Sequence, residues 1–423
     1  AGAIRVVLDE QKEDLRRFLE TTRLVQRERQ LDFDVLLGSK LISVILGVRR
    51  SGKSTICAQL DFAGVGYVNF DDERLIGVKA ADLNRIYEVL LQSTPNMTAI
   101  VFDEIQNVAG WELFVNRLQR KGLKLIVTGS NGQLLGRELS THLTGRHLSL
   151  ELFPFSFGEY LRFHHVETPS TWTTEHRASV KARFDEYVVR GGFPEVVQGE
   201  HPGPYLRELF DRIISRDVLQ RRALKSSKAL KELALYLVQN PGCLVSYQRL
   251  ARTFEFKSVH TLKSYVGFLE ETYLVQELLA YSNKIRERLT MPRKIYGIDT
   301  GMIRALSSKP TRDRGAELET LVFLHLRRAS RELYYFRTAS AEVDFVECQN
   351  GKPVQLVQSC LSIADAKTRA REVRSLVHAA KTLKTSKHLI VTWDEEEKIE
   401  EEGITIAVIP LWKYLIEPKN EVD

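Results

Sequence analysis

The chain has 423 residues, of which 43% are hydrophobic and 27% are charged, with 25 Gly and 12 Pro. This composition is near the average for globular proteins, so it excludes collagen-like, low-complexity and wholly disordered chains, and the length allows about two or three domains. The formal net charge of +6 is compatible with a polyanionic partner.

Apolar runs and cysteines bear on where the protein works. The longest apolar stretch, residues 41–48, is far shorter than the roughly 18 residues that span a bilayer, so no membrane segment is predicted. Residues 1–18 become charged before a signal-like apolar core forms. The cysteines lie far apart without a C-x-x-C pair, which predicts reduced thiols and a cytoplasmic protein. They are Cys57, Cys243, Cys348 and Cys360.

The first part of the chain has the pattern of an α/β domain. Apolar residues at helical spacing predict helix over the first forty residues. Short β-branched runs then alternate with helical or turn-rich stretches, which predicts a mainly parallel sheet covered on both faces. The predicted strands are residues 41–48, 66–70, 99–104, 123–130 and 147–153.

From about residue 168 the pattern changes to helices, interrupted by a Gly-Gly-Phe-Pro turn within residues 190–197. Three helices and a strand pair then predict a winged-helix unit. Their ranges are 228–240, 246–254 and 258–275 for the helices, and 276–282 and 293–299 for the strands.

The last part of the chain is again predicted to be α/β, and we find no internal repeat. A helix at residues 315–330 precedes three strands, a basic helix and two further strands. These strands are residues 333–338, 341–348, 352–360, 388–393 and 404–410.

Residues 47–54 match the phosphate-binding motif G-x-x-x-x-G-K-[ST], between a predicted strand and a predicted helix. Backbone N–H groups of such a loop cradle phosphates, Lys53 reaches the β and γ oxygens, and the Ser54 hydroxyl binds Mg²⁺. The motif therefore predicts ATP and Mg²⁺ as cofactors. The predicted nucleotide-binding residues are Gly47, Arg49, Arg50, Ser51, Gly52, Lys53, Ser54 and Thr55.

About fifty residues later, the strand at residues 99–104 ends in Asp103 and Glu104. Asp103 is predicted to hold Mg²⁺, and Glu104 to polarise the attacking water as general base. The adjacent glutamate favours hydrolysis over phosphoryl transfer to a small acceptor.

The next strand ends in a polar cluster, Thr128-Gly129-Ser130-Asn131, which is predicted to reach the γ-phosphate or the attacking water. Arg146 precedes the following strand, where a cation could stabilise transition-state charge on a neighbouring subunit's nucleotide. Arg137 is the alternative for that role.

Taken together, these features resemble the prokaryotic AAA+ ATPases that carry a C-terminal domain of unknown function with a restriction-endonuclease-like fold. The resemblance covers roughly residues 41–387. The strings that carry it are ILGVRRSGKST, IVFDEIQNVAGWELFVNRL, LIVTGSN, LTGRHLSLELFPFSFGEYL, RGGFPEVV, KIYGIDTG, AELETLVFLHLRR and EVDFVE.

The resemblance implies an α/β fold in which a P-loop AAA+ parallel sheet of order 5-1-4-3-2 carries a helical lid. A winged-helix unit and a nuclease-like α/β domain follow. The predicted parts are an N-terminal helical lead-in (1–40), the ATPase core (41–165), the lid (166–227), the winged helix (228–305) and a degenerate nuclease-like domain (306–423).

For the active site, the resemblance implies catalytic roles for Lys53 and Glu104, a sensor at Asn131 or Ser130, and Arg146 as an arginine finger in trans. A lid arginine that contacts the γ-phosphate is left open between two candidates, Arg190 and Arg216.

The C-terminal unit departs from the nuclease pattern. Nucleases of this fold place an acidic residue on one strand and E-x-K on the next, so that carboxylates bind a metal ion and a lysine assists water attack. Here Glu342 and Asp344 are present, but Gln358 and Cys360 stand where Glu and Lys are expected. An amide is a poorer Mg²⁺ ligand and a thiol carries no positive charge, so we expect DNA binding without cleavage.

Basic residues of two predicted helical regions are candidate phosphate contacts. The alternative to phosphate binding is that these residues only form solvated helix faces. The candidates are Lys257, His260 and Lys263 in the winged-helix unit and Lys367, Arg369, Arg371 and Arg374 on the basic helix.

The leading hypothesis is an oligomeric AAA+ ATPase that hydrolyses ATP to engage or remodel DNA. We expect the oligomer to be a ring, specifically a hexamer. Branched or Holliday-junction DNA is the expected substrate. The alternative is an ATP-gated switch that acts on a protein partner without DNA. An active ATP-dependent nuclease is disfavoured by Gln358 and Cys360. No membrane partner is expected.

Overall fold

The computed structural model describes residues 2–60, 64–132, 147–169, 171–222, 228–308 and 311–416, apart from the side chains of Gln30 and Leu31. The chain forms two compact units. The first unit comprises Ala1–Phe155, Phe193–Gln198 and Glu271–Tyr273, and the second unit comprises Ser156–Gly192, Gly199–Glu270 and Leu274–Asp423. In the described ranges, no helix combines the length and the apolar composition that a membrane span requires.

The first unit is built on a five-stranded parallel sheet of order β2-β3-β4-β1-β5. This is the order that the resemblance implied. The central strands are almost completely buried, as strands covered on both faces should be. The strands are β1 (Ile42–Leu46), β2 (Val65–Asn69), β3 (Ala99–Asp103), β4 (Lys124–Gly129) and β5 (His147–Glu151).

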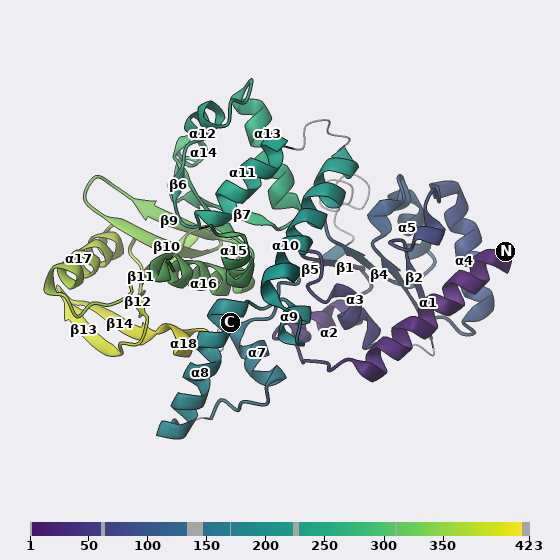
Figure 1. The fold of residues 1–423 in the computed structure, drawn as a ribbon, viewed down its shortest axis with the longest axis horizontal. Coiled ribbons are helices and arrows are strands. Elements are labelled where there is room, and N and C mark those ends of the chain that lie inside the picture. Colours follow the sequence, from purple (N-terminus) through teal and green to yellow (C-terminus); the bar gives the residue numbers. More distant parts are fainter. Residues whose placement is uncertain are drawn as a thin grey trace. The chain divides into compact units, whose positions relative to one another are not determined.

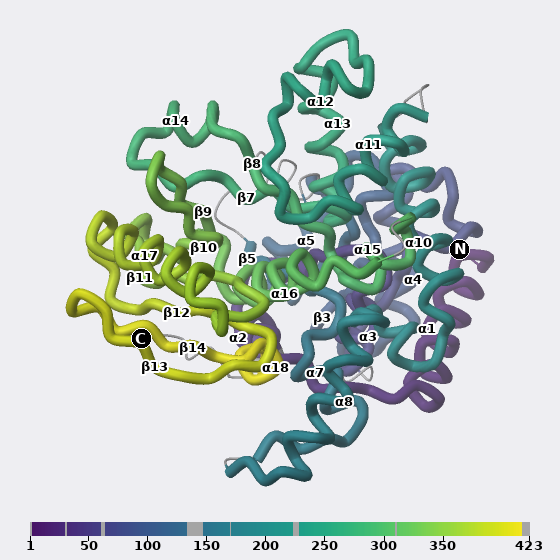
Figure 2. Tube along the Cα trace, turned by 60° about the vertical axis from the view of Figure 1, so that its left-hand side comes forward, coloured from purple at the N-terminus to yellow at the C-terminus, as the bar shows by residue number. Residues whose placement is uncertain are grey.

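Helices cover both faces of this sheet (Figure 1). Helix α1 lies beside α4 in both the ribbon and the tube views (Figures 1 and 2), and it also contacts β2. The helices are α1 (Gly2–Thr21), α2 (Gln30–Gly38), α3 (Lys53–Ala58), α4 (Leu83–Ser93), α5 (Trp111–Gln119) and α9 (Pro194–Val197), with 3₁₀ turns at Glu73–Leu75, Ala80–Asp82 and Ile105–Asn107.

The continuous helix expected over residues 1–40 is wrong, because the chain is not helical between α1 and α2. The apolar spacing of Leu24 and Val25 matched a helix, but Val25 is buried in a segment without regular secondary structure. The same segment carries the buried Arg27, whose side chain bonds to backbone carbonyls far along the chain. These tertiary contacts override the local helical pattern.

The second unit begins with helices that connect the two units along the chain. They are α7 (Phe157–Phe163), α8 (Thr174–Arg190), α10 (Pro202–Arg212) and a π-helical stretch, Ile213–Gln220. Ser156 and Glu159 form a reciprocal capping box at the start of α7, which satisfies backbone N–H groups that the first turn leaves open.

Three helices follow where they were expected, as α11 (Lys228–Gln239), α12 (Tyr247–Thr253) and α13 (Val259–Glu271). Strands β7 (Val275–Ala280) and β8 (Arg293–Gly297) are antiparallel, and β6 (Leu244–Val245) pairs with β8. The short helix α14 (Ile285–Thr290) lies between β7 and β8 and was not expected. Helices α15 (Thr300–Leu306) and α16 (Arg314–Ala329) come next.

These strands belong to a nine-stranded mixed sheet of order β13-β14-β12-β11-β10-β9-β7-β8-β6. Parallel pairing of β7 with β9 joins the strands expected in the winged-helix unit to those of the last part of the chain. The remaining elements are β9 (Leu333–Arg337), β10 (Glu342–Gln349), β11 (Lys352–Ser359), α17 (Ala366–Leu383), β12 (Lys387–Thr392), β13 (Glu397–Glu401), β14 (Ile404–Pro410) and α18 (Leu411–Tyr414).

Strand β13 was not predicted, because it lies within the acidic run at residues 394–402. Only Ile399 of its five residues is buried. A strand at the edge of a sheet needs few apolar side chains, and charges protect its free edge from other strands.

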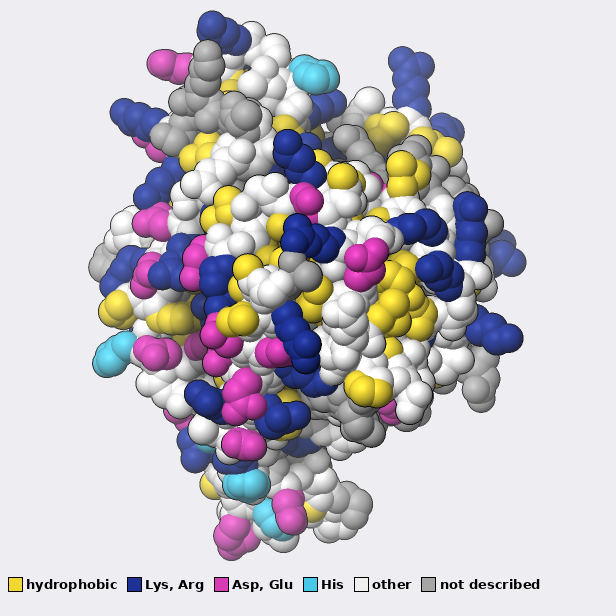
Figure 3. All heavy atoms as spheres, turned by 90° about the vertical axis from the view of Figure 1, so that its right-hand side faces the viewer, with side chains coloured by type: hydrophobic (Ala, Val, Ile, Leu, Met, Phe, Trp, Pro, Cys, Tyr) yellow, Lys and Arg dark blue, Asp and Glu magenta, His cyan; other side chains and the backbone are white. Residues whose placement is uncertain are grey.

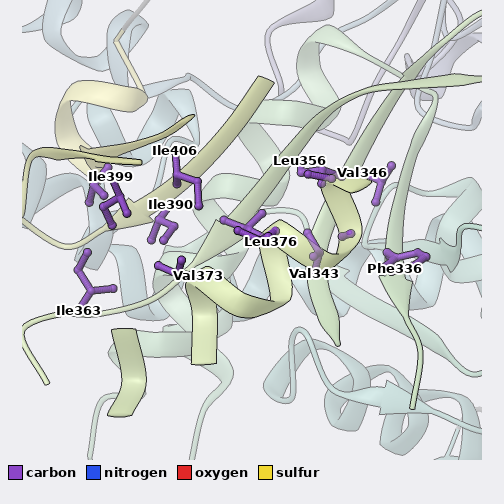
Figure 4. Close-up of a cluster of buried hydrophobic side chains, with 14 of the residues drawn as sticks. Phe336, Val343, Val346, Leu356, Ile363, Val373, Leu376, Ile390, Ile399 and Ile406 are labelled. Atoms are coloured by element: carbon purple, nitrogen blue, oxygen red, sulfur yellow. The ribbon is translucent and has the colours of Figure 1, made fainter. Parts of the chain in front are cut away.

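Helix α17 packs on this sheet through an apolar face. Val373 and Leu376 lie among side chains of the sheet strands, including Ile390 and Ile406 (Figure 4). Basic residues lie on the exposed surface of the helix, among them Lys367, Arg371, Arg374 and Lys381.

Two sequence strings that carry the resemblance, RGGFPEVV and KIYGIDTG, meet in the second unit at the buried carboxylate of Asp299. Asp299 Oδ2 accepts a hydrogen bond from the backbone N of Gly192 at 2.7 Å, and Oδ1 accepts one from Met302 N at 2.9 Å. A Cβ on Gly191 would lie 2.1 Å from Asp299 Oδ1. Burial raises the pKa of Asp299 to about 6, although the backbone hydrogen bonds oppose the rise.

We expect Gly191→Ala to destabilise the protein by about 2 to 3 kcal/mol, because φ is +80 and the new Cβ has no space. Urea denaturation of the full chain, followed by circular dichroism, measures this loss. Gly267→Ala is the matched control, since a Cβ there meets nothing within 4 Å on helix α13, and it should be neutral or mildly stabilising. Equal midpoints for the two variants would contradict the close packing at Gly191.

Candidate nucleotide-binding and hydrolysis site

Two glycines determine the path of the loop between β1 and α3. A Cβ on Gly47 would lie 2.1 Å from the carbonyl oxygen of Leu152. Gly52 has φ +93 and caps the N-terminus of α3, in a conformation that residues with a Cβ rarely adopt. The glycines of the P-loop motif are therefore required by the backbone itself.

Lys53 is buried within this loop. Its Nζ donates to the carbonyl oxygens of Gly47 and Val48, each at 3.1 Å, and lies 3.6 Å from Glu104 Oε1. The side chain is only 5% exposed. An ammonium with three donors, held by neutral carbonyls and one distant carboxylate, is available to an incoming anion.

Arg27 lies outside every motif but holds the P-loop. Its Nη1 donates to the carbonyl oxygen of Ser51 at 2.9 Å, and its Nη2 donates to that of Phe153 at 2.6 Å. The guanidinium also stacks over the Phe155 ring, 5.0 Å from its centre. No sequence signal marks this residue, because its partners are backbone atoms and a ring far along the chain.

Asp103 ends β3 and is completely enclosed. Its Oδ2 accepts a hydrogen bond from Tyr67 Oη at 2.8 Å, and its Oδ1 accepts one from Thr128 Oγ1. Burial raises the pKa of Asp103, and the charge of Glu104 adds to this, while hydrogen bonds from Thr128, Ser54 and Tyr67 oppose it. A cation bound beside this carboxylate would relieve the cost of burying its charge.

Glu104 takes a left-handed backbone conformation, with φ +53, directly after the strand. Its Oε2 accepts hydrogen bonds from Ser130 Oγ at 3.0 Å and from Gln106 Nε2, and lies 3.3 Å from Ser130 N. The positive φ and these donors hold the carboxylate toward Lys53 and the end of β4.

The polar cluster after β4 thus meets the acidic pair, as the order of parallel strands requires. Thr128 contacts Asp103, and its Oγ1 also accepts a hydrogen bond from Glu104 N at 3.1 Å. Ser130 contacts Glu104, and Asn131 is buried directly beyond it. Both Arg137 and Arg146 lie outside the described residues.

A cavity of about 670 Å³ opens beside these groups, a volume typical of small-molecule sites. It is lined by Lys53, Ser54, Thr55, Asp103 and Glu104 from the predicted set. Helix α1 contributes further lining residues that no motif marks, namely Gln11, Asp14, Leu15 and Phe18.

Gln11 ties α1 to the end of β2. Its Nε2 donates to the carbonyl oxygen of Asn69 at 3.1 Å, and its Oε1 accepts from Asn69 N at 2.9 Å. Nε2 also donates to Asp72 at 2.8 Å. The N-terminal helix is therefore part of the site rather than only a lead-in to it.

The two arginines of the P-loop turn toward carboxylates. Arg49 lies 3.3 Å from Asp71, and Arg50 lies 3.4 Å from Glu195 of α9. Both side chains border the cavity, so the predicted contacts with phosphate would compete with these ion pairs.

The residues present fit a nucleoside triphosphate with Mg²⁺. Ser51 Oγ is buried and has no hydrogen-bond partner in the described part of the chain, which leaves a donor available in the loop. Lys53 and the loop would hold the phosphates, and Ser54 and Asp103 would hold Mg²⁺. When bound, Mg²⁺ would neutralise charge on the phosphate oxygens.

In the second unit, Asp344 and Glu342 lie near Lys294, whose Nζ is 2.8 Å from Asp344 Oδ1 and 3.6 Å from Glu342 Oε1. Gln358 accepts from Asp344 N at 3.3 Å and donates to Glu372 at 2.8 Å. Lys294 was not predicted, because it belongs to a different strand, β8.

The predicted DNA contacts fall into two groups. On α17, Arg369 makes a two-pronged ion pair with Glu397 of β13, at 2.6 and 2.7 Å, and Arg371 pairs with Glu372. Lys367 and Arg374 on the same helix are exposed. In the three-helix region, Lys257, His260 and Lys263 are exposed, and Lys263 lies over the Tyr247 ring.

Family models and a relative identify the family to which the chain belongs. Three family models match consecutive parts of the chain: an AAA domain at residues 39–161, and domains of unknown function DUF8612 at 181–313 and DUF4143 at 314–414. "Uncharacterized protein MJ1544" of Methanocaldococcus jannaschii is 32% identical over 407 residues, 90% of each chain. The chain belongs to this family of AAA proteins with a C-terminal DUF4143 domain.

An uncharacterized protein of Haemophilus influenzae is 29% identical over 388 residues, which are 88% of this chain and 94% of the relative. The AAA domain of the family supports ATP hydrolysis as the activity of the first unit.

Two solved structures align at low similarity. Drosophila ORC bound to AT-rich DNA and Cdc6 has 9% identity and a TM-score of 0.22, over 72% of this chain and 94% of the other. A DNA polymerase III gamma subunit-related protein from Thermotoga maritima has 11% identity and a TM-score of 0.27, over 58% and 100%. The strand order and the P-loop, rather than these two structures, carry the assignment of the fold.

We expect Glu104→Gln to lower ATP turnover by about 100-fold or more, because general-base catalysis contributes about 10² to 10⁴. ATP affinity should be retained, since Lys53 and the loop are unchanged. Steady-state hydrolysis and binding of a fluorescent ATP analogue measure the two effects. Glu88→Gln on the exposed face of α4 is the control and should match the wild type. Full turnover in Glu104→Gln would remove Glu104 from the mechanism.

Proposed function

We propose that this protein is an oligomeric AAA+ ATPase that couples ATP hydrolysis to the binding or remodelling of DNA. The observation that carries the ATPase part is the meeting of Lys53, Asp103 and Glu104 at one cavity, with Thr128 and Ser130 bonded to the two carboxylates. The cytoplasm is the compartment that the reduced thiols predict.

In the proposed hydrolysis, residues at the ends of β1, β3 and β4 have different roles. Lys53 would bind phosphate oxygens, and Asp103 would stay ionised to hold the metal ion. Glu104 would accept the proton of the attacking water, with Ser130 orienting its carboxylate. The sensor role remains between Ser130 and Asn131.

The DNA part is supported by the three-helix region with its strands β6, β7 and β8, which we propose to be a winged helix. In that region Lys257, His260 and Lys263 are exposed. The nuclease-like domain is proposed to bind DNA without cutting it, because Gln358 stands where a metal-binding glutamate is expected. Its amide accepts a hydrogen bond from Asp344 N and donates one to Glu372. Branched DNA is the proposed substrate form.

One observation favours the second candidate, an ATP-gated switch that acts on a protein partner. Acidic residues in and directly after β13 neutralise part of the basic helix α17, because Arg369 pairs with Glu397 of the strand and Lys381 pairs with Glu402, which follows it. Such pairing is not typical of a DNA-binding surface, which is usually a contiguous basic patch. Figure 3 shows a face other than that of α17, and basic and acidic side chains are intermixed on it as well.

ATP turnover in the presence of different nucleic acids separates the two candidates. Linear duplex, single-stranded and four-way-junction DNA are each added to wild type and to Glu104→Gln. Stimulation by one DNA form, absent in Glu104→Gln, supports the DNA motor and identifies its substrate. Equal turnover throughout, with no salt-sensitive binding, supports the protein switch.

We expect Lys257→Ala with Lys263→Ala to weaken DNA binding and to reduce the salt dependence of log affinity by roughly 2, because each lost phosphate contact lowers the slope by about 1. Fluorescence anisotropy at roughly 50 to 200 mM salt, the range over which such affinities change strongly, measures the salt dependence. The control has the same charge change at exposed lysines of β11 and the end of α17, Lys352→Ala with Lys384→Ala. Loss of slope in the control alone would place the DNA on the DUF4143 part.

We propose that Arg146 of one subunit completes the site of its neighbour. Two variants that are inactive alone should then restore ATP hydrolysis when they are mixed. Arg146→Ala and Glu104→Gln should each be inactive alone, since an arginine finger contributes about 10³ to 10⁵ in turnover. A mixture should regain activity, because Glu104→Gln subunits supply Arg146 to intact sites of their Arg146→Ala neighbours. The measurement is turnover against mixing ratio, with sedimentation giving the ring size. A mixture no more active than its parts would contradict the trans arrangement.

A further inference from the structure

The second unit contains a buried ammonium surrounded by carboxylates from elements far apart in the chain. Lys294 Nζ of β8 lies 2.8 Å from Asp344 Oδ1, 3.0 Å from Glu319 Oε1 and 3.6 Å from Glu342 Oε1. Asp344 and Glu342 belong to β10, and Glu319 belongs to α16. The Lys294 side chain is 4% exposed, so these carboxylates take the place of its hydration shell.

The surrounding donors fix the carboxylates in this arrangement. Asp344 Oδ2 accepts hydrogen bonds from Ser359 N at 3.0 Å and Ser359 Oγ at 2.7 Å. Glu319 Oε1 accepts one from Tyr296 Oη at 2.7 Å. The carboxylate oxygens that face Lys294 therefore come from groups already oriented by the sheet and by α16.

The three carboxylates exceed the charge of the single ammonium. Burial works against the charge on Lys294, but Asp344 and Glu319 outweigh it and raise the pKa of Lys294. Burial and the charge of Asp344 raise the pKa of Glu319 to about 7. Arg337 lies 3.5 Å from Glu342 at the exposed side and balances part of the excess.

The acidic groups converge on the ammonium rather than on one another. In the described ranges, no three acidic, His or Cys side chains are placed to hold a metal ion directly. Yet Glu342 and Asp344 are the acidic residues on the strand where, by the resemblance, nucleases of this fold carry a metal ligand. The ammonium compensates one of these negative charges, so it supplies part of the neutralisation that a divalent cation would supply among the same carboxylates.

We infer that Lys294 is a built-in counter-cation that occupies the position of a divalent metal ion, so that the DUF4143 part keeps its acidic cluster without metal. Removal of the ammonium should convert Glu319, Glu342 and Asp344 into a site for a divalent cation. This inference concerns the second unit alone and is independent of ATP hydrolysis and of whether DNA is the partner.

The test compares Mn²⁺ binding to nucleotide-free full-length wild type, Lys294→Met and Lys294→Met with Asp344→Asn. Electron paramagnetic resonance of free Mn²⁺ gives the bound fraction, and thermal melting gives the stabilisation by Mn²⁺ at matched ionic strength. Lys294→Met should bind one Mn²⁺ more than wild type and melt at higher temperature when Mn²⁺ is added. Adding Asp344→Asn should abolish both effects. Lys352→Met, at an exposed lysine of β11, is the control.

Because Lys294→Met leaves uncompensated carboxylates, it is expected to be less stable without cations. The variant Lys294→Met with Glu319→Gln removes one charge of each sign and keeps the chain foldable, and it should bind Mn²⁺ more weakly than Lys294→Met. Two results would overturn the inference. One is Mn²⁺ binding to wild type that Asp344→Asn removes, and the other is no additional Mn²⁺ both in Lys294→Met and in Lys294→Met with Glu319→Gln.

Discussion

The candidate catalytic groups depend on the parallel pairing of β1, β3 and β4. Parallel strands end at the same edge of a sheet, so the P-loop after β1, the carboxylates after β3 and the hydroxyls near the end of β4 must meet. The bonds from Thr128 to Asp103 and from Ser130 to Glu104 follow directly from that pairing. An antiparallel neighbour in place of β4 would send these hydroxyls to the opposite edge.

Among the residues that the structure describes, Lys53 and Lys294 are the buried lysines, and their electrostatic settings differ. Lys53 donates to neutral carbonyl oxygens and lies 3.6 Å from its nearest carboxylate, so an anion can compete for it at little cost. Lys294 is 2.8 and 3.0 Å from two carboxylates and near a third. The first arrangement is open to a ligand, whereas the second is already neutralised from within the protein.

The features that could be read from the sequence are those that local chemistry determines. A P-loop needs glycines and a lysine at fixed spacing, and the acidic pair needs a strand before it, so Lys53, Asp103 and Glu104 could be named. The order of the five strands came from the resemblance to a known family, and the structure has the same order.

The features that could not be predicted arise from contacts between distant segments. Arg27 binds backbone carbonyls of Ser51 and Phe153, and backbone atoms carry no residue-specific signal. Lys294 meets Asp344 only because β7 and β9 pair and join two groups of strands in one sheet. Strand β13 was missed because an edge strand with one buried residue lacks the apolar alternation by which strands are recognised.

The same long-range pairing changes how the charge of the chain should be interpreted. In the sequence, the basic helix and the acidic run that follows it are separate, and each by itself indicates a charged surface. In the fold, β13 and the turn after it lie close enough to α17 for Arg369 to bind Glu397 and for Lys381 to bind Glu402. These pairs cancel opposite charges locally, so the number of basic residues on α17 overstates the positive field that the helix presents. The exposed Lys257, His260 and Lys263 of the three-helix region therefore carry more weight than α17 in any argument for a polyanionic partner.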